Sequence, residues 1–136
     1  MESCEWYTPP YIFEKYNKQY SFDLDVCATE LSAKCKNYFD IEQNALKQNW
    51  IGTCWMNPPY KNANLWVQKA YSESIKNKNI IVCLLPVRTS TDYWQDIILP
   101  YAKIEYLRGR VAFGSPNGIV GTARHDSAIV VFDCSD

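Results

Sequence analysis

The residues with the clearest chemical potential are the four at Asn57-Pro58-Pro59-Tyr60, which follow an apolar, strand-like run. Two consecutive prolines stiffen this segment and remove two backbone donors, which leaves its carbonyl oxygens to accept hydrogen bonds. An Asn side-chain oxygen beside a rigid carbonyl oxygen provides two acceptors, which match the two hydrogens of a planar amine such as that of adenine. Holding both hydrogens draws the nitrogen lone pair out of ring conjugation, so the nitrogen can attack an electrophilic methyl group.

These properties predict Asn57 and Pro58 as catalytic residues, and Tyr60 as a face on which an extruded base stacks. A proline turn with an Asn helix cap is the structural alternative for so short a motif. The context favours chemistry, because the motif lies between an expected strand at residues 53–56 and an expected helix at residues 62–76.

The surrounding elements are expected to alternate between helix and strand. Residues 80–85 are apolar without alternation, which is typical of a strand buried on both faces of a parallel sheet. Thr8 is expected to cap a first helix, with Pro9 at its first position. The other expected helices are 29–37 and 91–99, the latter stopped by Pro100, and the other expected strands are 22–26, 38–39, 104–107, 111–113 and 127–132.

This order predicts an α/β fold with a mostly parallel sheet and an antiparallel end. In such sheets, ligands bind beyond the carboxyl ends of the strands. Three segments follow predicted strands in this way, and they carry most of the polar candidates: Asp25-Val26-Cys27-Ala28, Asn57-Pro58-Pro59-Tyr60 and Pro86-Val87-Arg88-Thr89.

The composition excludes several classes of protein. With 136 residues, 47% hydrophobic and 21% charged, the chain is expected to form one globular domain and not a disordered segment. No apolar run approaches the roughly 20 residues that span a membrane, and the acidic start lacks a signal peptide, so we expect a cytoplasmic protein. The six cysteines form no Cys-x-x-Cys pair and His125 is the only histidine, so we expect reduced thiols and no metal site.

Charge is distributed unevenly along the chain. The net charge is -1, but residues 1–45 carry eight acids and four bases, whereas residues 60–125 carry nine bases and four acids. Basic residues of the second half are candidates for contacts with DNA phosphate, namely Lys61, Arg88, Arg108, Arg110 and Arg124. Arg108 and Arg110 are expected on the same side of a strand, with an ion pair to Glu105 or Asp126 as the structural alternative.

The sequence resembles the phage-type, Dam-like DNA N6-adenine methyltransferases over nearly the whole chain. The Asn-Pro-Pro-Tyr segment resembles their catalytic motif, and the order of the matching segments is more specific than any one of them. The other matching segments are Trp6-Tyr7-Thr8-Pro9, Phe22 to Ala28, Asn44-Ala45-Leu46 with Trp50, and Leu107 to Phe113.

The resemblance implies a shortened Rossmann-like class I methyltransferase fold, with residues 1–136 as a single domain and no separate target-recognition domain. It implies S-adenosyl-L-methionine as cofactor and DNA as partner, with methylation of the exocyclic N6 amine of adenine by base extrusion and direct in-line transfer. A homodimer is compatible with the aromatic-rich composition. The implied cofactor-binding residues are Trp6, Thr8, Pro9, Asp25, Cys27, Ala28 and Asn44.

Some residues depart from the family pattern. No glycine follows Asp25, and Asp40 or Glu42 is the candidate for the acid that holds the cofactor ribose. Asn44 stands where many relatives have Asp, although an amide also suits the edge of adenine. Two alternatives stay open: a methyltransferase for another planar nitrogen, such as cytosine amine or protein glutamine, and a non-catalytic nucleic-acid-binding domain.

Overall fold

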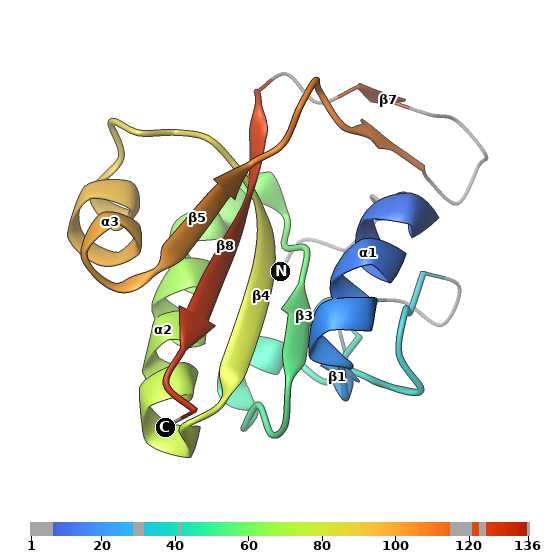
Figure 1. Ribbon diagram of the computed structural model, residues 1–136. Helices are drawn as coiled ribbons and strands as arrows, with labels where there is room; N and C mark the ends of the chain where they lie inside the picture. Colours follow the sequence, from blue (N-terminus) through green and yellow to red (C-terminus); the bar gives the residue numbers. More distant parts are fainter. Residues whose placement is uncertain (1–6, 29–31, 41, 115–120, 123–124, 136) are drawn as a thin grey trace.

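The computed structural model describes residues 7–28, 32–40, 42–114, 121–122 and 125–135. A six-stranded sheet runs through the centre, with helices on both of its faces (Figure 1). Its strands, in spatial order, are β2 (Asn37–Tyr38), β1 (Leu24–Asp25), β3 (Cys54–Met56), β4 (Ile80–Pro86), β8 (Ser127–Asp133) and β5 (Lys103–Tyr106).

The strand directions confirm the prediction of a mostly parallel α/β sheet. Strands β2, β1, β3 and β4 pair in parallel, whereas β8 is antiparallel to both β4 and β5. Strand β5 therefore runs in the same direction as β4. A separate antiparallel pair, β6 (Ala112–Phe113) and β7 (Gly121–Thr122), lies beyond the end of the large sheet near α1 (Figure 1).

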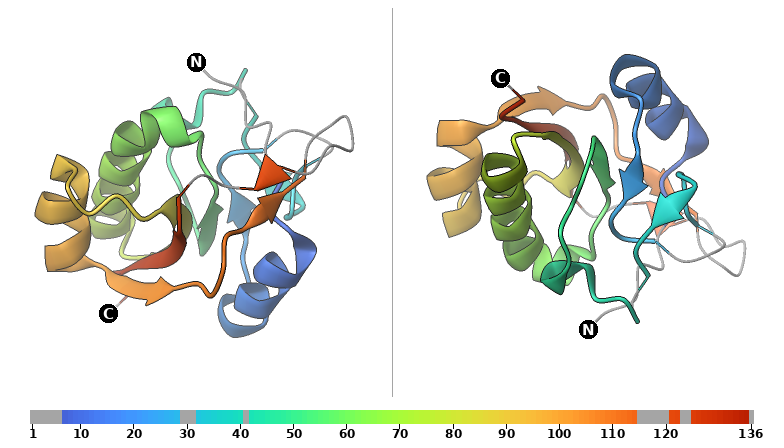
Figure 2. Two further views of the ribbon diagram at one scale, coloured as in Figure 1. Left: turned by 90° about the horizontal axis from the view of Figure 1, so that it is seen from above. Right: turned by 90° about the horizontal axis from the view of Figure 1, so that it is seen from below.

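Each face of the sheet packs against its own helix. The helix α1 (Pro10–Tyr20) covers one face, and α2 (Ala63–Asn77) covers the other together with the π-helical turn η3 (Trp94–Ile98) and α3 (Leu99–Tyr101) (Figure 2). Alternate residues of a strand point to opposite faces. In β3, Cys54 and Met56 thus join the core under α2, while Trp55 joins the core under α1.

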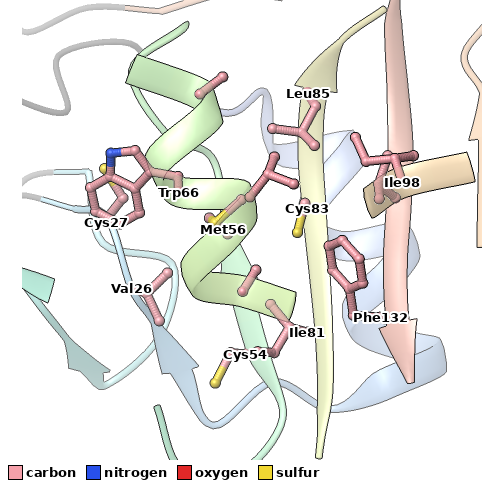
Figure 3. Packing of buried hydrophobic residues seen from close by; sticks show 14 of the residues in the cluster. Val26, Cys27, Cys54, Met56, Trp66, Ile81, Cys83, Leu85, Ile98 and Phe132 are labelled. Atoms are coloured by element: carbon pink, nitrogen blue, oxygen red, sulfur yellow. The ribbon is translucent and has the colours of Figure 1, made fainter. Parts of the chain in front are cut away.

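Strand β4 is the centre of both cores, as its apolar sequence predicts. Ile81, Cys83 and Leu85 pack toward α2, as Figure 3 shows, and Val82 and Leu84 pack toward α1. All five side chains are fully buried. Cys54 and Cys83 are also free thiols at 0% exposure, which confirms that they serve as small hydrophobic residues.

Helix α1 begins differently from the prediction. Pro9 occupies the position before the helix and Pro10 is its first residue, without any side-chain cap. The expectation that Thr8 caps this helix is therefore wrong, because its hydroxyl oxygen accepts a hydrogen bond from Asn57 instead. Proline suits the first turn because the missing N–H has no helical acceptor there.

Three further local predictions are wrong for physical reasons. Residues 32–36 form a turn and bends and not a helix, and Asn37 already belongs to β2; the Lys34 N–H donates to the Asp25 carboxylate instead of to a helical carbonyl, and residues 29–31 lie outside the described residues. Pro100 does not stop its helix, because it lies in the first turn of α3, and the Ala102 N–H continues the helical pattern to the Ile98 carbonyl at 2.9 Å. Arg108 and Arg110 do not share a strand face, because Gly109 between them has a left-handed φ of 72°.

A buried acid on α2 fixes the loop that leads into β3. Glu73 is 2% exposed, accepts a hydrogen bond from the Trp50 N–H at 2.7 Å, and pairs with Lys69 and Lys76. Burial alone raises the pKa of Glu73, but the Trp50 hydrogen bond and the two lysines outweigh it and lower that pKa. The carboxylate is therefore held ionised, and the loop is tied to the helix that follows β3.

None of the described helices combines the length and the apolar character needed to cross a membrane.

Replacing this buried acid tests how the loop is held. We expect Glu73→Ala to lower the free energy of unfolding by about 1–3 kcal/mol at pH 7, because the buried Trp50 N–H loses its acceptor. Since the pKa of Glu73 is lowered in the fold, the difference from wild type should shrink as acid protonates the carboxylate. Urea unfolding measures this, with exposed Glu14→Ala as the control; equal stability of the two variants would contradict the account.

Candidate functional site

Three predicted site segments meet at one edge of the sheet. Strands β1, β3 and β4 are neighbours and run in parallel, so their carboxyl ends carry Asp25, Asn57 and Arg88 to the same side. The chain leaves β1 for β2 on one side and then returns to β3 on the other, which makes the gap between β1 and β3 the topological switch point. Ligands of open α/β sheets bind at such points.

The Asn57 side chain is held by the segment that precedes α1. Its Nδ2 donates a hydrogen bond to the Thr8 Oγ1 at 3.0 Å, and the two residues are 8% and 4% exposed. Because Nδ2 faces Thr8, the amide oxygen is turned away from Thr8. The neighbouring Pro58 is buried, so the Asn57 amide and the Pro58 backbone sit on a rigid support.

The same N-terminal segment is anchored to the small sheet. The Tyr7 N–H donates to the Gly114 carbonyl at 2.8 Å, and the Gly114 N–H donates back to the Tyr7 carbonyl at 3.1 Å. This bridge fixes the residue directly before Thr8. The segment before α1, which bonds to Asn57, is therefore itself fixed by the segment after β6, although the three parts are far apart in sequence.

Tyr60 begins the short η2 helix (Tyr60–Asn62) directly after the prolines. Its ring meets the edge of the Phe113 ring, with the centroids 5.9 Å apart. Burial raises the pKa of Tyr60 to about 12, although the nearby Ser127 hydroxyl lowers it, so the phenol stays neutral at physiological pH. The ring remains partly exposed and neutral, as a stacking surface for a base requires.

Asp25 is a buried carboxylate at the switch point. It is 3% exposed, and it accepts hydrogen bonds from the Cys27 N–H at 3.3 Å and the Lys34 N–H at 3.1 Å. Burial raises the pKa of Asp25 to about 7, against the opposing effect of these two bonds and of the Lys34 charge. The side chain therefore shapes the loop after β1 and favours any cation that binds beside it.

The two predicted cofactor residues after Asp25, Cys27 and Ala28, are both buried. Ala28 is 1% exposed, and its N–H donates to the Phe39 carbonyl at 3.0 Å. Cys27 is 6% exposed and disulfide-bonded, so the prediction of a reduced thiol is wrong there; Cys35, Cys54, Cys83 and Cys134 are free.

Asn44 carries an unusual buried acceptor. It adopts a left-handed φ of 51° before the η1 turn (Ala45–Lys47), and its Oδ1 has no hydrogen-bond partner among the described residues. Trp50 lies behind this turn at 0% exposure and donates from its Nε1 to the Ala45 carbonyl at 2.9 Å. Since a buried, unpaired acceptor is costly, Asn44 is suited to a ligand that donates from an amine.

The two acids considered for a ribose lie just before this turn. Asp40 exchanges hydrogen bonds with Gln43, at 2.9 Å to the Asp40 N–H and 3.1 Å to the Asp40 carboxylate. Glu42 is exposed. These bonds give Asp40 a role in the turn that presents Asn44.

The predicted DNA-contacting residues do not all lie together in the structure. Lys61 and Arg88 line one pocket of about 440 Å³, between α2 and η3. Arg110 lies 4.0 Å from Asp126 in an exposed ion pair, which is the structural alternative considered for it, and Arg108 lies in an exposed turn. Arg124 and the proposed cofactor residue Trp6 lie outside the described residues.

The pocket also contains side chains that are not among the predicted site residues, namely Gln68, Tyr93 and Asp96. The sequence does contain a signal for Gln68, because it lies seven residues, or two helical turns, after the predicted DNA-contacting residue Lys61. Tyr93 and Asp96 belong to the segment that returns toward α2 after Arg88, and no local pattern in the sequence indicates that return.

Comparison with known proteins relates the chain to one family. The family model described as DNA N-6-adenine-methyltransferase (Dam) matches residues 2–133. A protein named DNA N-6-adenine-methyltransferase from Haemophilus phage HP1 (strain HP1c1) is 44% identical over 102 residues, which is 72% of this chain. A protein of the same name from Escherichia phage T1 is 34% identical over 97 residues, or 67% of this chain.

Both relatives are longer than the part that is matched. The aligned regions cover 58% of the Haemophilus phage protein and 39% of the Escherichia phage protein. The similarity therefore shows the family, while the activity of the whole relatives extends to this chain only as a proposal.

The buried carboxyl of Asp25 predicts a specific dependence of stability on pH. Because burial raises its pKa to about 7, the folded state retains a proton that the unfolded state releases at lower pH. This contribution to stability is present in acid and is lost as the pH rises through 7. We therefore expect the free energy of unfolding of Asp25→Asn, taken relative to that of the wild type at the same pH, to increase from pH 5 to pH 8.

Urea unfolding at four pH values across this range measures the difference. The exposed Asp126→Asn provides the control, for which the difference from wild type should change less with pH. A difference for Asp25→Asn that is flat across the range would show that the carboxyl already titrates as an exposed acid does.

Proposed function

Because the chain belongs to the DNA N-6-adenine-methyltransferase (Dam) family, we propose that it methylates the exocyclic N6 amine of adenine in DNA, with S-adenosyl-L-methionine as methyl donor. The observation that carries this proposal is the buried Asn57 amide, oriented by Thr8 at the carboxyl end of β3. The shortened Rossmann-like class I methyltransferase fold is part of the same proposal, and the mostly parallel sheet supports it.

Two features of the described residues fit the methyl donor. Asp25 is a buried carboxylate at the switch point, suited to the ammonium group of an amino acid, and Asn44 Oδ1 is a buried acceptor without a partner, suited to an adenine amine. We assign the cofactor site to these two residues together with Thr8, Pro9, Cys27 and Ala28, and to Trp6 from the family resemblance. When bound, S-adenosyl-L-methionine supplies an electrophilic methyl group.

The chain's own residues prepare the amine that receives the methyl group. The Asn57 amide oxygen and the Pro58 carbonyl oxygen accept the two amine hydrogens, which concentrates the lone pair on nitrogen. Because Thr8 and the prolines fix these acceptors beforehand, little reorganisation is needed when charge develops. The methylated amine loses its proton readily, so no strong base is required at the site.

The target base must leave the duplex to reach this position. We propose that Tyr60 stacks on the extruded adenine, since its ring is neutral and partly exposed beside Phe113. Lys61 and Arg88, which line the neighbouring pocket, are then placed to contact DNA phosphate. Arg108, Arg110 and Arg124 are further candidates for phosphate contacts in this proposal; Arg110 also pairs with Asp126, and Arg124 is proposed from the sequence alone.

A methyl-transfer assay tests the substrate class. Purified protein is incubated with radiolabelled S-adenosyl-L-methionine and, separately, with unmethylated DNA, RNA or a protein extract. We expect incorporation into DNA alone. Incorporation into protein or RNA would favour the alternative planar nitrogens, and cofactor binding without any transfer would favour a non-catalytic domain.

Substitutions at Asn57 and Thr8 test the proposed catalytic arrangement. Asn57→Ala should reduce turnover by at least about 100-fold, since the amide acts on the transition state, while cofactor affinity stays largely unchanged. Thr8→Val should cause a smaller loss of kcat, because the amide remains but loses its fixed orientation. Thr8→Ser, which keeps the hydroxyl, is the matched control; near-normal turnover of Asn57→Ala in a folded protein would refute the mechanism.

A separate prediction concerns the cofactor. Asp25→Ala should weaken binding of S-adenosyl-L-methionine about tenfold or more, because a charge-assisted bond contributes about 1.5–3 kcal/mol. In the wild type, affinity should rise as the pH rises from about 6 to 7, because ionisation of Asp25 creates the partner for the ammonium group while that group is still protonated. Calorimetric titration measures both effects, with Glu14→Ala as control; unchanged affinity in Asp25→Ala would remove this residue from the site.

A further inference from the structure

We propose that the pocket between α2 and η3 binds a nucleotide that neighbours the target adenine, and that it selects a base with an exocyclic amine over thymine or uracil. This inference rests on the proposed function, because it requires that DNA is the substrate. It assigns a reading role to residues of α2 and η3 that neither the catalytic arrangement nor the cofactor site uses.

The position of the pocket indicates an adjacent nucleotide. Tyr60 lines it, whereas Asn57 and Pro58 do not, so the pocket adjoins Tyr60 but does not include the two residues proposed to hold the reacting amine. A ligand in the pocket would therefore be connected to, but distinct from, the extruded base. Its volume of about 440 Å³ lies within the range of about 300–1,000 Å³ that holds small organic ligands.

The charges of the lining favour a base together with its phosphate over a phosphate alone. Lys61 and Arg88 are balanced by Asp92 and Asp96, so a bare anion would meet carboxylates as well as cations. A nucleotide resolves this conflict, because its phosphate suits the basic side chains and an amine on its base suits the acids. Aspartate accepts from the cytosine N4 amine in known base contacts.

The amides of the pocket reinforce this selection. Asn64 and Gln68 are one turn apart on α2 and both line the pocket. Side-chain amides combine an acceptor with a donor, which is the pattern that pairs with the amine and ring nitrogen of adenine. Thymine and uracil present a carbonyl oxygen where cytosine has its amine, and that oxygen would face the carboxylates without a shared hydrogen.

The wall of the pocket also contains a buried tyrosine. Tyr93 is 7% exposed, and its hydroxyl makes no hydrogen bond of ordinary geometry although it lies near Thr91. The Thr91 hydroxyl itself donates to the Arg88 carbonyl at 2.8 Å. Tyr93 and Ile97 both line the pocket, and their side chains provide apolar surface for a base beside the polar groups.

The test compares bases that differ in the amine. Oligonucleotides carry cytosine or uracil immediately 5′ or 3′ of one target adenine, and a second set carries adenine or purine, which lacks the amine. Binding is measured by fluorescence anisotropy and methylation in a single turnover. At one of the two positions, we expect the amine-bearing base to be favoured about tenfold, which is the scale of discrimination by a single good base contact.

Variants assign this preference to the pocket. Gln68→Ala and Asp92→Ala should bring the ratio between the two bases close to one, while Gln19→Ala, an exposed glutamine on α1, should leave it unchanged. Thermal melts establish that the variants fold. Variants that weaken binding of both bases equally, or a wild type without preference at either position, would overturn the proposal.

The two readouts separate this proposal from the proposed function. Methylation of adenine without any preference for the neighbouring base would contradict the proposed role of the pocket but not the proposed activity. If the protein binds the amine-bearing base preferentially and Gln68→Ala removes this preference, but no oligonucleotide is methylated, the result would support the proposed role of the pocket and contradict the proposed activity. Absence of binding to every oligonucleotide would contradict both.

Discussion

The pairing of β3 with β1 on one side and β4 on the other is the constraint on which the rest of the structure depends. Because all three strands run in parallel, their carboxyl ends meet, and Asp25, Asn57 and Arg88 reach one edge although 63 positions separate the first from the last. Three residues of β3 suffice for this, since Trp55 anchors the core under α1 while Cys54 and Met56 anchor the core under α2. The buried carboxylate of Glu73 holds the loop before β3.

The site contains polar groups that folding alone would not favour. Asp25 is almost fully buried with its pKa raised to about 7, and Asn44 has a buried oxygen without a partner. Both features cost stability in the free protein, and both are suited to groups that a ligand supplies. Glu73 shows the contrast, because it is equally buried but is satisfied by Trp50 and by two lysines that lower its pKa.

The sequence predicts those features that local pattern determines. The unalternating run at residues 80–85 identifies the central strand, and the double proline locates the rigid loop at the end of β3. Contacts between distant residues could not be read in this way. The hydrogen bond between Thr8 and Asn57 spans 49 positions, and no local pattern indicates it; the residues around Thr8 alone predict a helix cap. Alternation of side chains along a strand predicts Arg108 and Arg110 on one face, but the left-handed φ of Gly109 between them breaks that pattern. In the sequence, Glu73 looks like an ordinary surface acid of a helix; in the structure it is buried and bonded to the Trp50 N–H, 23 positions away.

The central claim is that the fixed acceptors at Asn57 and Pro58 act on the N6 amine of adenine in DNA. The most direct measurement is a nucleoside digest, by mass spectrometry, of DNA from methylation-deficient cells that express the wild-type chain or Asn57→Ala. The account predicts N6-methyldeoxyadenosine with the wild-type chain and none above background with Asn57→Ala. Methylcytosine in place of methyladenine, or equal methyladenine from both proteins, would contradict it.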